Sequence, residues 1–206
     1  MTVILDYGVG NLFSLRSSLA VIGEQSEITS DAQVIEKADR IILPGVGAFK
    51  DAMEKLKASG LVEPLRKAAK KGTPILGICL GMQLLFEKSY EYGEHEGLGF
   101  LKGEVAPIPV TGGIKIPHMG WNALDFGAKK HPLFRYLSEG DYVYFVHSYA
   151  AVNCAESVIA LTEYGTPVTA AVAKGNVMGC QFHPEKSGNV GLKILKAFCE
   201  MKEGEQ

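Results

Sequence analysis

Apolar residues in the first half of the chain form short continuous runs, separated by stretches with helical spacing. The runs Thr2–Asp6, Arg40–Leu43 and Thr73–Cys79 have the length and composition of buried strands. Between and after these runs, apolar side chains recur every three or four positions, and glycines end most of the periodic stretches. The predicted helices cover residues 12–22, 49–59, 61–71 and 80–86. Buried strands separated by helices predict a parallel sheet with right-handed crossovers.

The second half of the chain is richer in β-forming residues. The turn Lys174-Gly175-Asn176 joins two such segments and predicts a hairpin, and Asn189–Met201 has its apolar residues on one helical face. The predicted strands are Tyr142–Tyr149, Ser157–Leu161, Val168–Ala173 and Val177–Phe182. We therefore expect an α/β fold with a mixed, mostly parallel sheet flanked by helices. No repeat or linker-like stretch interrupts the chain, so we expect one domain over residues 1–206.

Composition and charge exclude several classes of protein. A hydrophobic fraction of 47% and a charged fraction of 21% are those of a globular chain, and disorder is excluded. The net charge of −2 gives no electrostatic footprint for nucleic acid or an anionic membrane. The N-terminus has no signal-peptide pattern, and the longest apolar stretch, Pro74–Phe86, is too short to span a bilayer. We expect a cytoplasmic protein that binds neither nucleic acid nor a membrane.

The four cysteines give no sign of a metal site, because none of them forms a C-x-x-C pair or clusters with histidines. Gly8-Val9-Gly10 follows the first strand, but Phe13 stands where the dinucleotide fingerprint needs a glycine. We therefore expect neither a metal nor a cofactor. Three cysteines have no context that suggests chemistry, and we interpret them as structural: Cys154, Cys180 and Cys199.

The strongest local signal is Gly77-Ile78-Cys79-Leu80-Gly81, between a predicted strand and a predicted helix. It has the form of a nucleophile elbow with cysteine in place of serine, in which the flanking glycines let the chain turn sharply. A cysteine at a helix N-terminus is also favoured as thiolate. The alternative is a buried cysteine in a glycine-rich turn. The strand–turn–helix setting favours Cys79 as a nucleophile.

A nucleophilic cysteine needs a base, and Phe182-His183-Pro184-Glu185 follows a predicted strand near the end of the chain. On extended backbone His183 and Glu185 point the same way, so the carboxylate can orient the imidazole. Taken alone, this pattern is also typical of a surface loop. With Cys79 it predicts a Cys–His–Glu triad. His95 and His131 are interpreted as residues of a polar loop and a turn.

The loop Pro44-Gly45-Val46-Gly47 leaves the second predicted strand. Its glycines allow backbone N–H groups to approach a substrate, and thiolate attack on a carbonyl requires donors for the oxyanion. In hydrolases with a nucleophile elbow, one donor is the residue after the nucleophile, here Leu80, and another comes from an earlier strand-to-helix loop. An ordinary tight turn is the alternative interpretation of this loop.

Together, Gly77-Ile78-Cys79-Leu80-Gly81-Met82-Gln83 and Phe182-His183-Pro184-Glu185 resemble the class I (triad) glutamine amidotransferases, with their flavodoxin-like fold, over essentially the whole chain. The resemblance implies that Cys79 attacks the side-chain amide of glutamine while Val46, Gly47 and Leu80 hold the oxyanion. His183, oriented by Glu185, would protonate the departing ammonia and then activate water. The residues implied to bind glutamine are Gln83, Glu91, His147, Ser148 and Tyr149.

Further runs narrow the resemblance to one branch of that family, which supplies ammonia to imidazole glycerol phosphate synthases in histidine biosynthesis. They are Asp6-Tyr7-Gly8-Val9-Gly10-Asn11, Pro44-Gly45-Val46-Gly47-Ala48-Phe49, Pro117-His118-Met119-Gly120-Trp121-Asn122 and Phe182-His183-Pro184-Glu185-Lys186-Ser187. The resemblance implies a heterodimer with a (β/α)₈-barrel cyclase, which receives the ammonia and forms imidazole glycerol phosphate and an aminoimidazole carboxamide ribotide. Candidate docking residues are Asn11, Trp121, Tyr144 and Lys186; a core position is the alternative for Trp121.

Three other functions stay open on the sequence. The chain could serve another synthase, such as that of anthranilate or pyridoxal phosphate. It could be a cysteine hydrolase that acts alone on γ-glutamyl substrates, or a catalytically silent binding module on the same scaffold. We also predict that Gly45–Gly47 is a switch, in which one peptide N–H turns away from the site until the acceptor is present.

Overall fold

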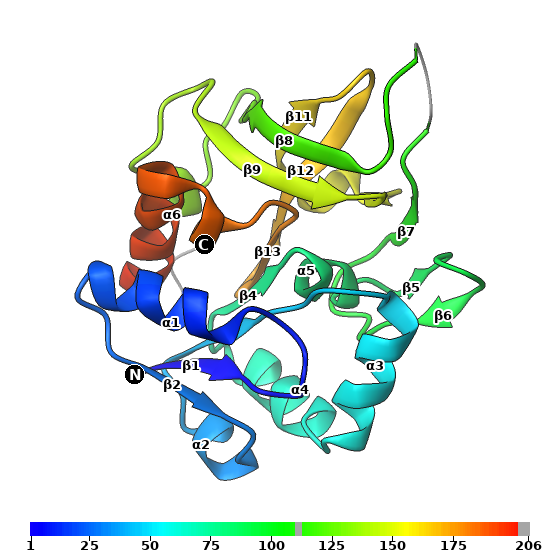
Figure 1. Ribbon diagram of the computed structural model, residues 1–206. Coiled ribbons are helices and arrows are strands. Elements are labelled where there is room, and N and C mark those ends of the chain that lie inside the picture. Colours follow the sequence, from blue (N-terminus) through cyan, green and yellow to red (C-terminus); the bar gives the residue numbers. More distant parts are fainter. Residues whose placement is uncertain (110–112, 202–206) are drawn as a thin grey trace.

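The computed structural model describes residues 1–109 and 113–201, and a central sheet runs through it (Figure 1). In the described residues this sheet has seven strands in the order β11-β12-β13-β4-β3-β1-β2. The strands are β1 (Thr2–Leu5), β2 (Ser26–Thr29), β3 (Arg40–Leu43), β4 (Ile75–Ile78), β11 (Val158–Glu163), β12 (Pro167–Lys174) and β13 (Val177–Cys180). Strands β2, β1, β3, β4 and β13 are parallel to one another. Strand β12 pairs antiparallel with β13, and β11 pairs antiparallel with β12. The expected α/β fold with a mixed, mostly parallel sheet is confirmed.

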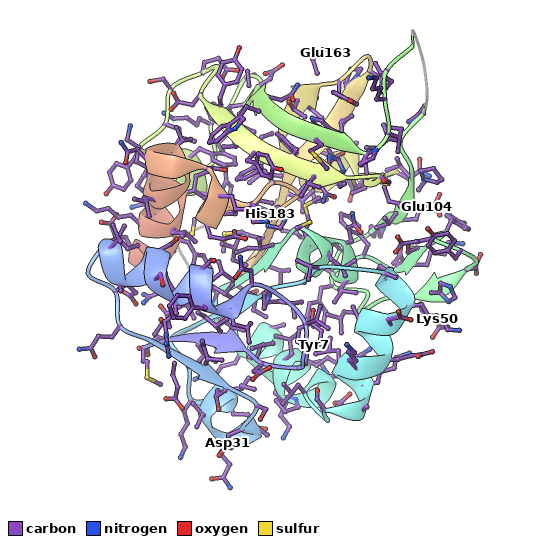
Figure 2. All side chains as sticks on the ribbon, in the orientation of Figure 1. Tyr7, Asp31, Lys50, Glu104, Glu163 and His183 are labelled. Atoms are coloured by element: carbon purple, nitrogen blue, oxygen red, sulfur yellow. The ribbon has the colours of Figure 1, made fainter. Side chains whose placement is uncertain are left out.

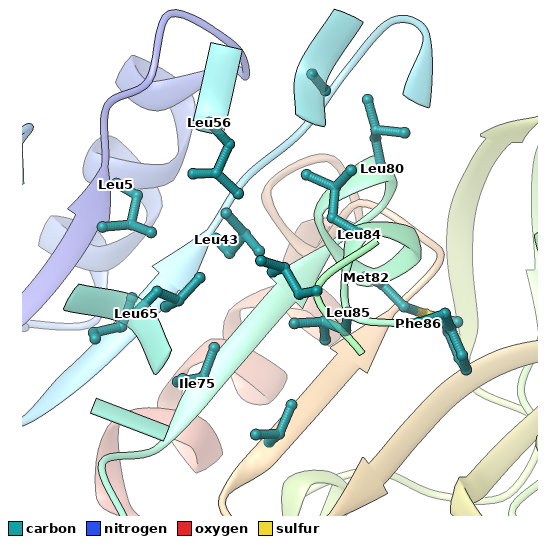
Figure 3. Close-up of a cluster of buried hydrophobic side chains, with 14 of the residues drawn as sticks. Leu5, Leu43, Leu56, Leu65, Ile75, Leu80, Met82, Leu84, Leu85 and Phe86 are labelled. Carbon is teal, nitrogen blue, oxygen red and sulfur yellow. The ribbon is translucent and has the colours of Figure 1, made fainter. Parts of the chain in front are cut away.

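Helices cover both faces of the sheet. They are α1 (Leu12–Val21), α2 (Ala32–Glu36), α3 (Phe49–Ala58), α4 (Val62–Lys71), α5 (Leu80–Leu84) and α6 (Gly188–Glu200). Because side chains alternate along a strand, each buried strand serves two cores. Leu5, Leu43 and Ile75 pack with α3, α4 and α5 (Figure 3). Ile4 and Leu76 belong to the other core, with residues of α1 and α6.

The strands of two smaller sheets lie between β4 and β11 in the chain. One is the ribbon of β8 (His118–Ala123) and β9 (Tyr142–His147), and the other has the order β10-β7-β5-β6. Its members are β5 (Lys88–Ser89), β6 (His95–Glu96), β7 (Glu104–Pro107) and β10 (Tyr149–Val152). Short 3-10 helices lie at Pro132–Phe134, Ala155–Ser157 and Pro184–Lys186. Side chains fill the space between the β8–β9 ribbon and the central sheet, and His183 is among them (Figure 2).

The structure corrects the predicted elements at several places. The predicted strand Tyr142–Tyr149 is divided at Ser148, because β9 pairs with β8 whereas β10 pairs with β7. Burial alternates along β9 as it does in one half-buried strand. This alternation does not reveal where the pairing strand changes from β8 to β7. The predicted strand Thr73–Cys79 is shorter, as β4, and the helix predicted over 80–86 ends at Leu84.

Other elements were correct or missed. The hairpin at Lys174-Gly175-Asn176 is confirmed by the antiparallel pairing of β12 with β13. The chain's last helix, predicted over Asn189–Met201, is α6. The sequence prediction missed β2, α2 and the short strands β5 to β8. All but β8 have two to five residues, and β8, with six, carries polar residues and a glycine, so these elements lack a periodic apolar pattern. Within the described residues, no helix combines the length and apolarity that a membrane span requires.

Three glycines allow β3, β4 and α5 to pack with their backbones in contact. A Cβ atom on Gly81 would lie 1.9 Å from the Leu43 carbonyl oxygen, and one on Gly77 would lie 2.6 Å from the Gly81 carbonyl oxygen. A Cβ atom on Gly45 would lie 2.5 Å from the Gly81 amide nitrogen. Backbone atoms cannot give way as a flexible side chain can. The glycines of the elbow and of the loop after β3 are therefore required by packing at the same point.

We expect Gly81→Ala to lower the free energy of unfolding by about 3 kcal/mol or more, because the new methyl group meets backbone. Gly179→Ala is the comparison variant, since its Cβ atom would meet side-chain atoms in place of backbone, Met82 Cγ at 2.6 Å and Met82 Cβ at 2.9 Å. Its expected loss is about 2 kcal/mol, because the buried Met82 side chain must shift but no backbone atom is in the way. Urea unfolding of both variants measures the difference. Equal losses would show that the contact at Gly81 is not the constraint described here.

Candidate active site

The residues predicted to carry chemistry follow strands whose carboxyl ends share one edge of the central sheet. Cys79 follows β4, the loop 44–47 follows β3, and Gln181 to Glu185 follow β13. These three strands are neighbours and parallel. Ligands of open α/β sheets bind at this edge, so the topology alone brings the three segments together.

Cys79 occupies a sharp turn between β4 and α5. Its φ of 54° and ψ of −112° are rare for a residue with a side chain, and such a backbone is kept only where its surroundings require it. The Cys79 amide donates to the Cys180 carbonyl at 2.8 Å, which ties the elbow to β13. The helix that follows has only five residues, so its dipole is weaker than the longer predicted helix would have supplied.

His183 and Glu185 form a buried pair. His183 Nδ1 lies 2.8 Å from Glu185 Oε1, and both side chains are almost fully buried. The His183 amide donates to the Tyr144 carbonyl at 2.9 Å, and the Ser187 hydroxyl donates to the His183 carbonyl at 2.6 Å. The histidine is therefore held from β9 as well as from its own segment. The 3-10 helix at Pro184–Lys186 places the carboxylate beside the ring, where the sequence had suggested an extended backbone.

The pKa of His183 is raised from 6.5 to about 9. Burial by itself lowers this pKa, but hydrogen bonds from the ring to Cys79 and Glu185, and the negative charges of both groups, outweigh burial. At neutral pH His183 is therefore an imidazolium. This imidazolium lies beside the sulfur of Cys79.

Two contacts of the Cys79 sulfur were not predicted from the sequence. The thiol lies 4.0 Å from the Val146 carbonyl oxygen, and the Gln181 side-chain amide donates to Cys79 Sγ at 3.7 Å. Gln181 is fully buried and also accepts a hydrogen bond from Gln83 at 2.9 Å. A buried glutamine within the apolar run before His183 was a signal that could have identified it, since buried polar groups need partners.

The loop 44–47 lies over the elbow and is held from the first loop of the chain. The Tyr7 hydroxyl donates to the Pro44 carbonyl at 2.6 Å, and burial raises the pKa of Tyr7 so that it keeps this proton. Val46 is 44% exposed, and Gly47 has a φ of +90° with open space around its Cα. Gly47 therefore has the conformational freedom that the predicted switch at Gly45–Gly47 requires; the switch itself stays a prediction.

A cavity of about 320 Å³ brings most of the predicted residues together. The predicted nucleophile, base, oxyanion and glutamine-binding residues that line it are Val46, Gly47, Cys79, Leu80, Gln83, Glu91, His147, Ser148, Tyr149 and His183. Pro117, Val146 and Lys186 complete the lining. Glu185 does not line the cavity and lies behind His183. Its Oε2 has no hydrogen-bond partner among the described residues.

Two polar residues of this cavity also hold the backbone around it. The Gln83 amide donates to the Tyr149 carbonyl at 3.0 Å as well as to Gln181, so both of its N–H groups bond within the protein. A contact of Gln83 with a substrate must then use Oε1. Glu91 Oε2 accepts from the Phe49 amide at 2.5 Å, which satisfies an N–H group at the start of α3.

The predicted docking residues are at the surface, with Lys186 also in the cavity wall. Trp121 is 52% exposed, so its alternative interpretation as a core residue is wrong. Its indole ring meets the Tyr144 ring edge-on across the β8–β9 ribbon, with centroids 6.0 Å apart. Asn11 is exposed at the start of α1.

Cys154, Cys180 and Cys199 are buried. Burial raises the pKa of each thiol, to about 12 for Cys199, so all three stay protonated at neutral pH. Their interpretation as structural residues fits these environments.

The model of the class-I glutamine amidotransferase family matches residues 3–201, and the chain therefore belongs to this family. It hydrolyses glutamine and transfers the ammonia, as enzymes of this family do.

Curated relatives narrow the similarity within the family. A protein of Lactococcus lactis is 55% identical over 96% of this chain and 97% of its own length. Proteins of Wolinella succinogenes and Aquifex aeolicus are each 51% identical over at least 95% of both chains. All three are named imidazole glycerol phosphate synthase subunit HisH.

Solved structures share the fold at much lower identity. One titled as a glutamine amidotransferase superposes with a TM-score of 0.75 at 19% identity, covering 96% of this chain and 97% of the other. The structure of PurLQS from Thermotoga maritima gives 0.73 at 21% identity, with 96% of each chain covered. These likenesses support the fold.

We expect the alkaline limb of kcat/KM for glutamine hydrolysis to lie near pH 9, where His183 loses its proton. Glu185→Gln removes a hydrogen-bonded negative charge that raises this pKa. The limb should then move to lower pH by about one unit or more, and turnover should fall on the order of 100-fold. Rate–pH profiles of the two proteins measure both effects. An unchanged limb in the variant would contradict the role of Glu185.

Proposed function

We propose that the chain is the glutaminase subunit of an imidazole glycerol phosphate synthase, with Cys79, His183 and Glu185 as its catalytic triad. The observation that carries the proposal is the cavity of about 320 Å³ at the carboxyl edge of the sheet. It contains the only elbow cysteine of the described residues, an imidazolium held by a buried carboxylate, and polar groups for one small substrate. The names and near-complete coverage of the curated relatives support the particular synthase.

The first chemical step uses the charge pair of Cys79 and His183. The thiolate attacks the side-chain amide carbon of glutamine, and the carbonyl oxygen takes up the negative charge. His183 then gives its proton to the departing nitrogen, so that ammonia leaves and a γ-glutamyl thioester remains on Cys79. In the second step neutral His183 takes a proton from water, which attacks the thioester and releases glutamate.

The tetrahedral intermediate needs donors for its oxyanion, and the segments on either side of Cys79 can supply them. Leu80 is the first residue of α5, and Val46 and Gly47 lie in the same cavity wall. The amide groups of these three residues are the proposed oxyanion hole. Gln83, Glu91 and the segment His147-Ser148-Tyr149 form the remaining polar wall and are proposed to hold the amino-acid end of glutamine.

Ammonia in neutral water is mostly protonated and no longer nucleophilic, so it must pass directly to the enzyme that consumes it. We propose a (β/α)₈-barrel cyclase as the partner in a heterodimer, docked on the face formed by Asn11, Trp121, Tyr144 and Lys186. The exposed Trp121 ring supports this face, since a half-exposed tryptophan is a common anchor of protein interfaces. Lys186 belongs to both the cavity wall and the proposed docking face, which supports a release of ammonia next to the docked partner.

Glutamine hydrolysis should be slow with the chain alone and rise on the order of 100-fold with the cyclase and its ribonucleotide ligand. The physical reason is the proposed switch at Gly45–Gly47, which completes the oxyanion hole only in the complex. Steady-state glutamate release under the three conditions measures the rise, and Cys79→Ala should be inactive in all of them. Full turnover by the free chain, with no response to the partner, would instead indicate a hydrolase that acts alone.

Replacing Trp121 by alanine should weaken binding of the cyclase on the order of 30-fold or more, because an anchoring aromatic contributes much of an interface's free energy. Tyr136→Ala is the matched control, since this exposed aromatic ring lies beside α6 and contacts Glu200. Titration calorimetry compares the dissociation constants. If both variants bind as the wild type does, the docking face lies elsewhere.

A further inference from the structure

A series of hydrogen-bonded polar groups runs behind the glutamine cavity from the β8–β9 ribbon to Gln83. His118 Nε2 lies 2.8 Å from Asn122 Oδ1, and His118 Nδ1 lies 2.9 Å from His147 Nε2. His147 Nδ1 lies 2.8 Å from the Tyr149 carbonyl oxygen, the same oxygen that accepts from Gln83. None of the catalytic steps above uses His118.

The His118 ring has no freedom to leave this position. It is fully buried and stacks between the rings of Phe145 and Tyr164, with centroid separations of 4.7 Å and 3.9 Å. Its strand β8 pairs with β9 in register, so that His118 stands directly opposite His147. Because the His118 ring is held between two aromatic rings and lies opposite His147 in the ribbon, it holds the His147 ring to which it is hydrogen-bonded.

The hydrogen bonds in this series need more ring protons than two neutral histidines carry. Asn122 donates from its amide nitrogen to the Glu163 carbonyl at 2.9 Å, so its oxygen faces His118 and His118 must donate from Nε2. This series of hydrogen bonds therefore begins at the Glu163 carbonyl, which is an acceptor, and ends at the Tyr149 carbonyl, which is also an acceptor. Two neutral imidazoles carry two ring protons, whereas the three contacts of their nitrogens need three.

Both histidines are neutral at physiological pH. Burial lowers the pKa of His118, and burial lowers the pKa of His147 to about 4, with further lowering by the positive charge of His183 and some raising by the hydrogen bond to the Tyr149 carbonyl. The other titratable groups that face the pair are His183, near His147, and Tyr164, whose ring stacks on His118. Neutral His118 uses its single proton on Asn122 and presents a lone pair to His147. His147 then has one proton for two acceptors, His118 Nδ1 and the Tyr149 carbonyl.

We propose that His118 is a positioning residue for the glutamine cavity. It shares the single ring proton of His147 with the Tyr149 carbonyl, and it thereby holds the His147 ring and the backbone that anchors Gln83. Either tautomer of His147 forms one of the two hydrogen bonds without moving the ring, and water in the glutamine cavity that His147 lines carries the proton between its two nitrogens. This inference rests on the proposed glutamine site, and it assigns to β8 a part in shaping that site.

Two substitutions of His118 separate positioning from packing. His118→Gln keeps one acceptor and one donor on a side chain that can face both His147 and Asn122. His118→Phe keeps an aromatic ring between Phe145 and Tyr164 but removes both hydrogen bonds. Asn122→Ala is a further variant, at a half-buried position, that frees His118 Nε2 should the phenylalanine variant fail to fold.

The experiment combines ¹⁵N spectra of the histidine rings in the full chain with glutamine kinetics in the presence of saturating cyclase. In the wild type both ring nitrogens of His147 should give resonances averaged between protonated and unprotonated values. In His118→Phe the proton should stay on Nδ1, and KM for glutamine should rise about fivefold while kcat changes less than about twofold. His118→Gln should keep the averaged resonances and a KM near that of the wild type, and Asn122→Ala should raise KM by a smaller factor.

A wild-type His147 with one fixed tautomer that persists in His118→Phe would overturn the proposal. So would equal KM values in the glutamine and phenylalanine variants, since packing alone would then explain the position. A wild-type chain that hydrolyses no glutamine, with or without the cyclase, would refute the proposed function. The ring spectra would in that case still decide the proton-sharing between His118 and His147.

Discussion

The close approach of backbone at the carboxyl ends of β3 and β4 is the constraint on which the site depends. The Leu43 carbonyl oxygen occupies the place where a side chain at position 81 would begin, and the loop after β3 lies directly against the start of α5. Glycine at positions 45, 77 and 81 makes this contact possible. The contact places the proposed oxyanion donors from two different loops around one sulfur atom, and it helps to maintain the unusual backbone of Cys79.

Electrostatics then separates this sulfur from the other three cysteines of the chain. Burial raises the pKa of the Cys154, Cys180 and Cys199 thiols, and nearby carboxylates raise it further at Cys180 and Cys199, so all three stay protonated. Cys79 has beside it an imidazolium whose proton is retained by a buried carboxylate.

The sequence allowed the elbow and the His-x-Glu pair to be predicted because each is a local pattern with a fixed geometric consequence. The parallel order of the strands then followed from alternating buried runs and helices, and it brought Cys79 near His183. The split of the run 142–149 between two sheets could not be predicted, since β9 alternates as one half-buried strand and only Tyr149 of the run belongs to β10. The contacts of His118 with His147 and of Gln181 with Cys79 depend on tertiary pairing across 29 and 102 positions, and no local pattern encodes such pairs.

The central claim is that Cys79 forms a covalent bond to the γ-glutamyl group of glutamine. Its most direct test is acid quenching of the chain and its cyclase partner during turnover of radiolabelled glutamine, followed by peptide mapping. We predict label on the peptide that contains Cys79, removable by hydroxylamine and absent in Cys79→Ala. Turnover of glutamine without label on Cys79, or label that persists in Cys79→Ala, would contradict the account.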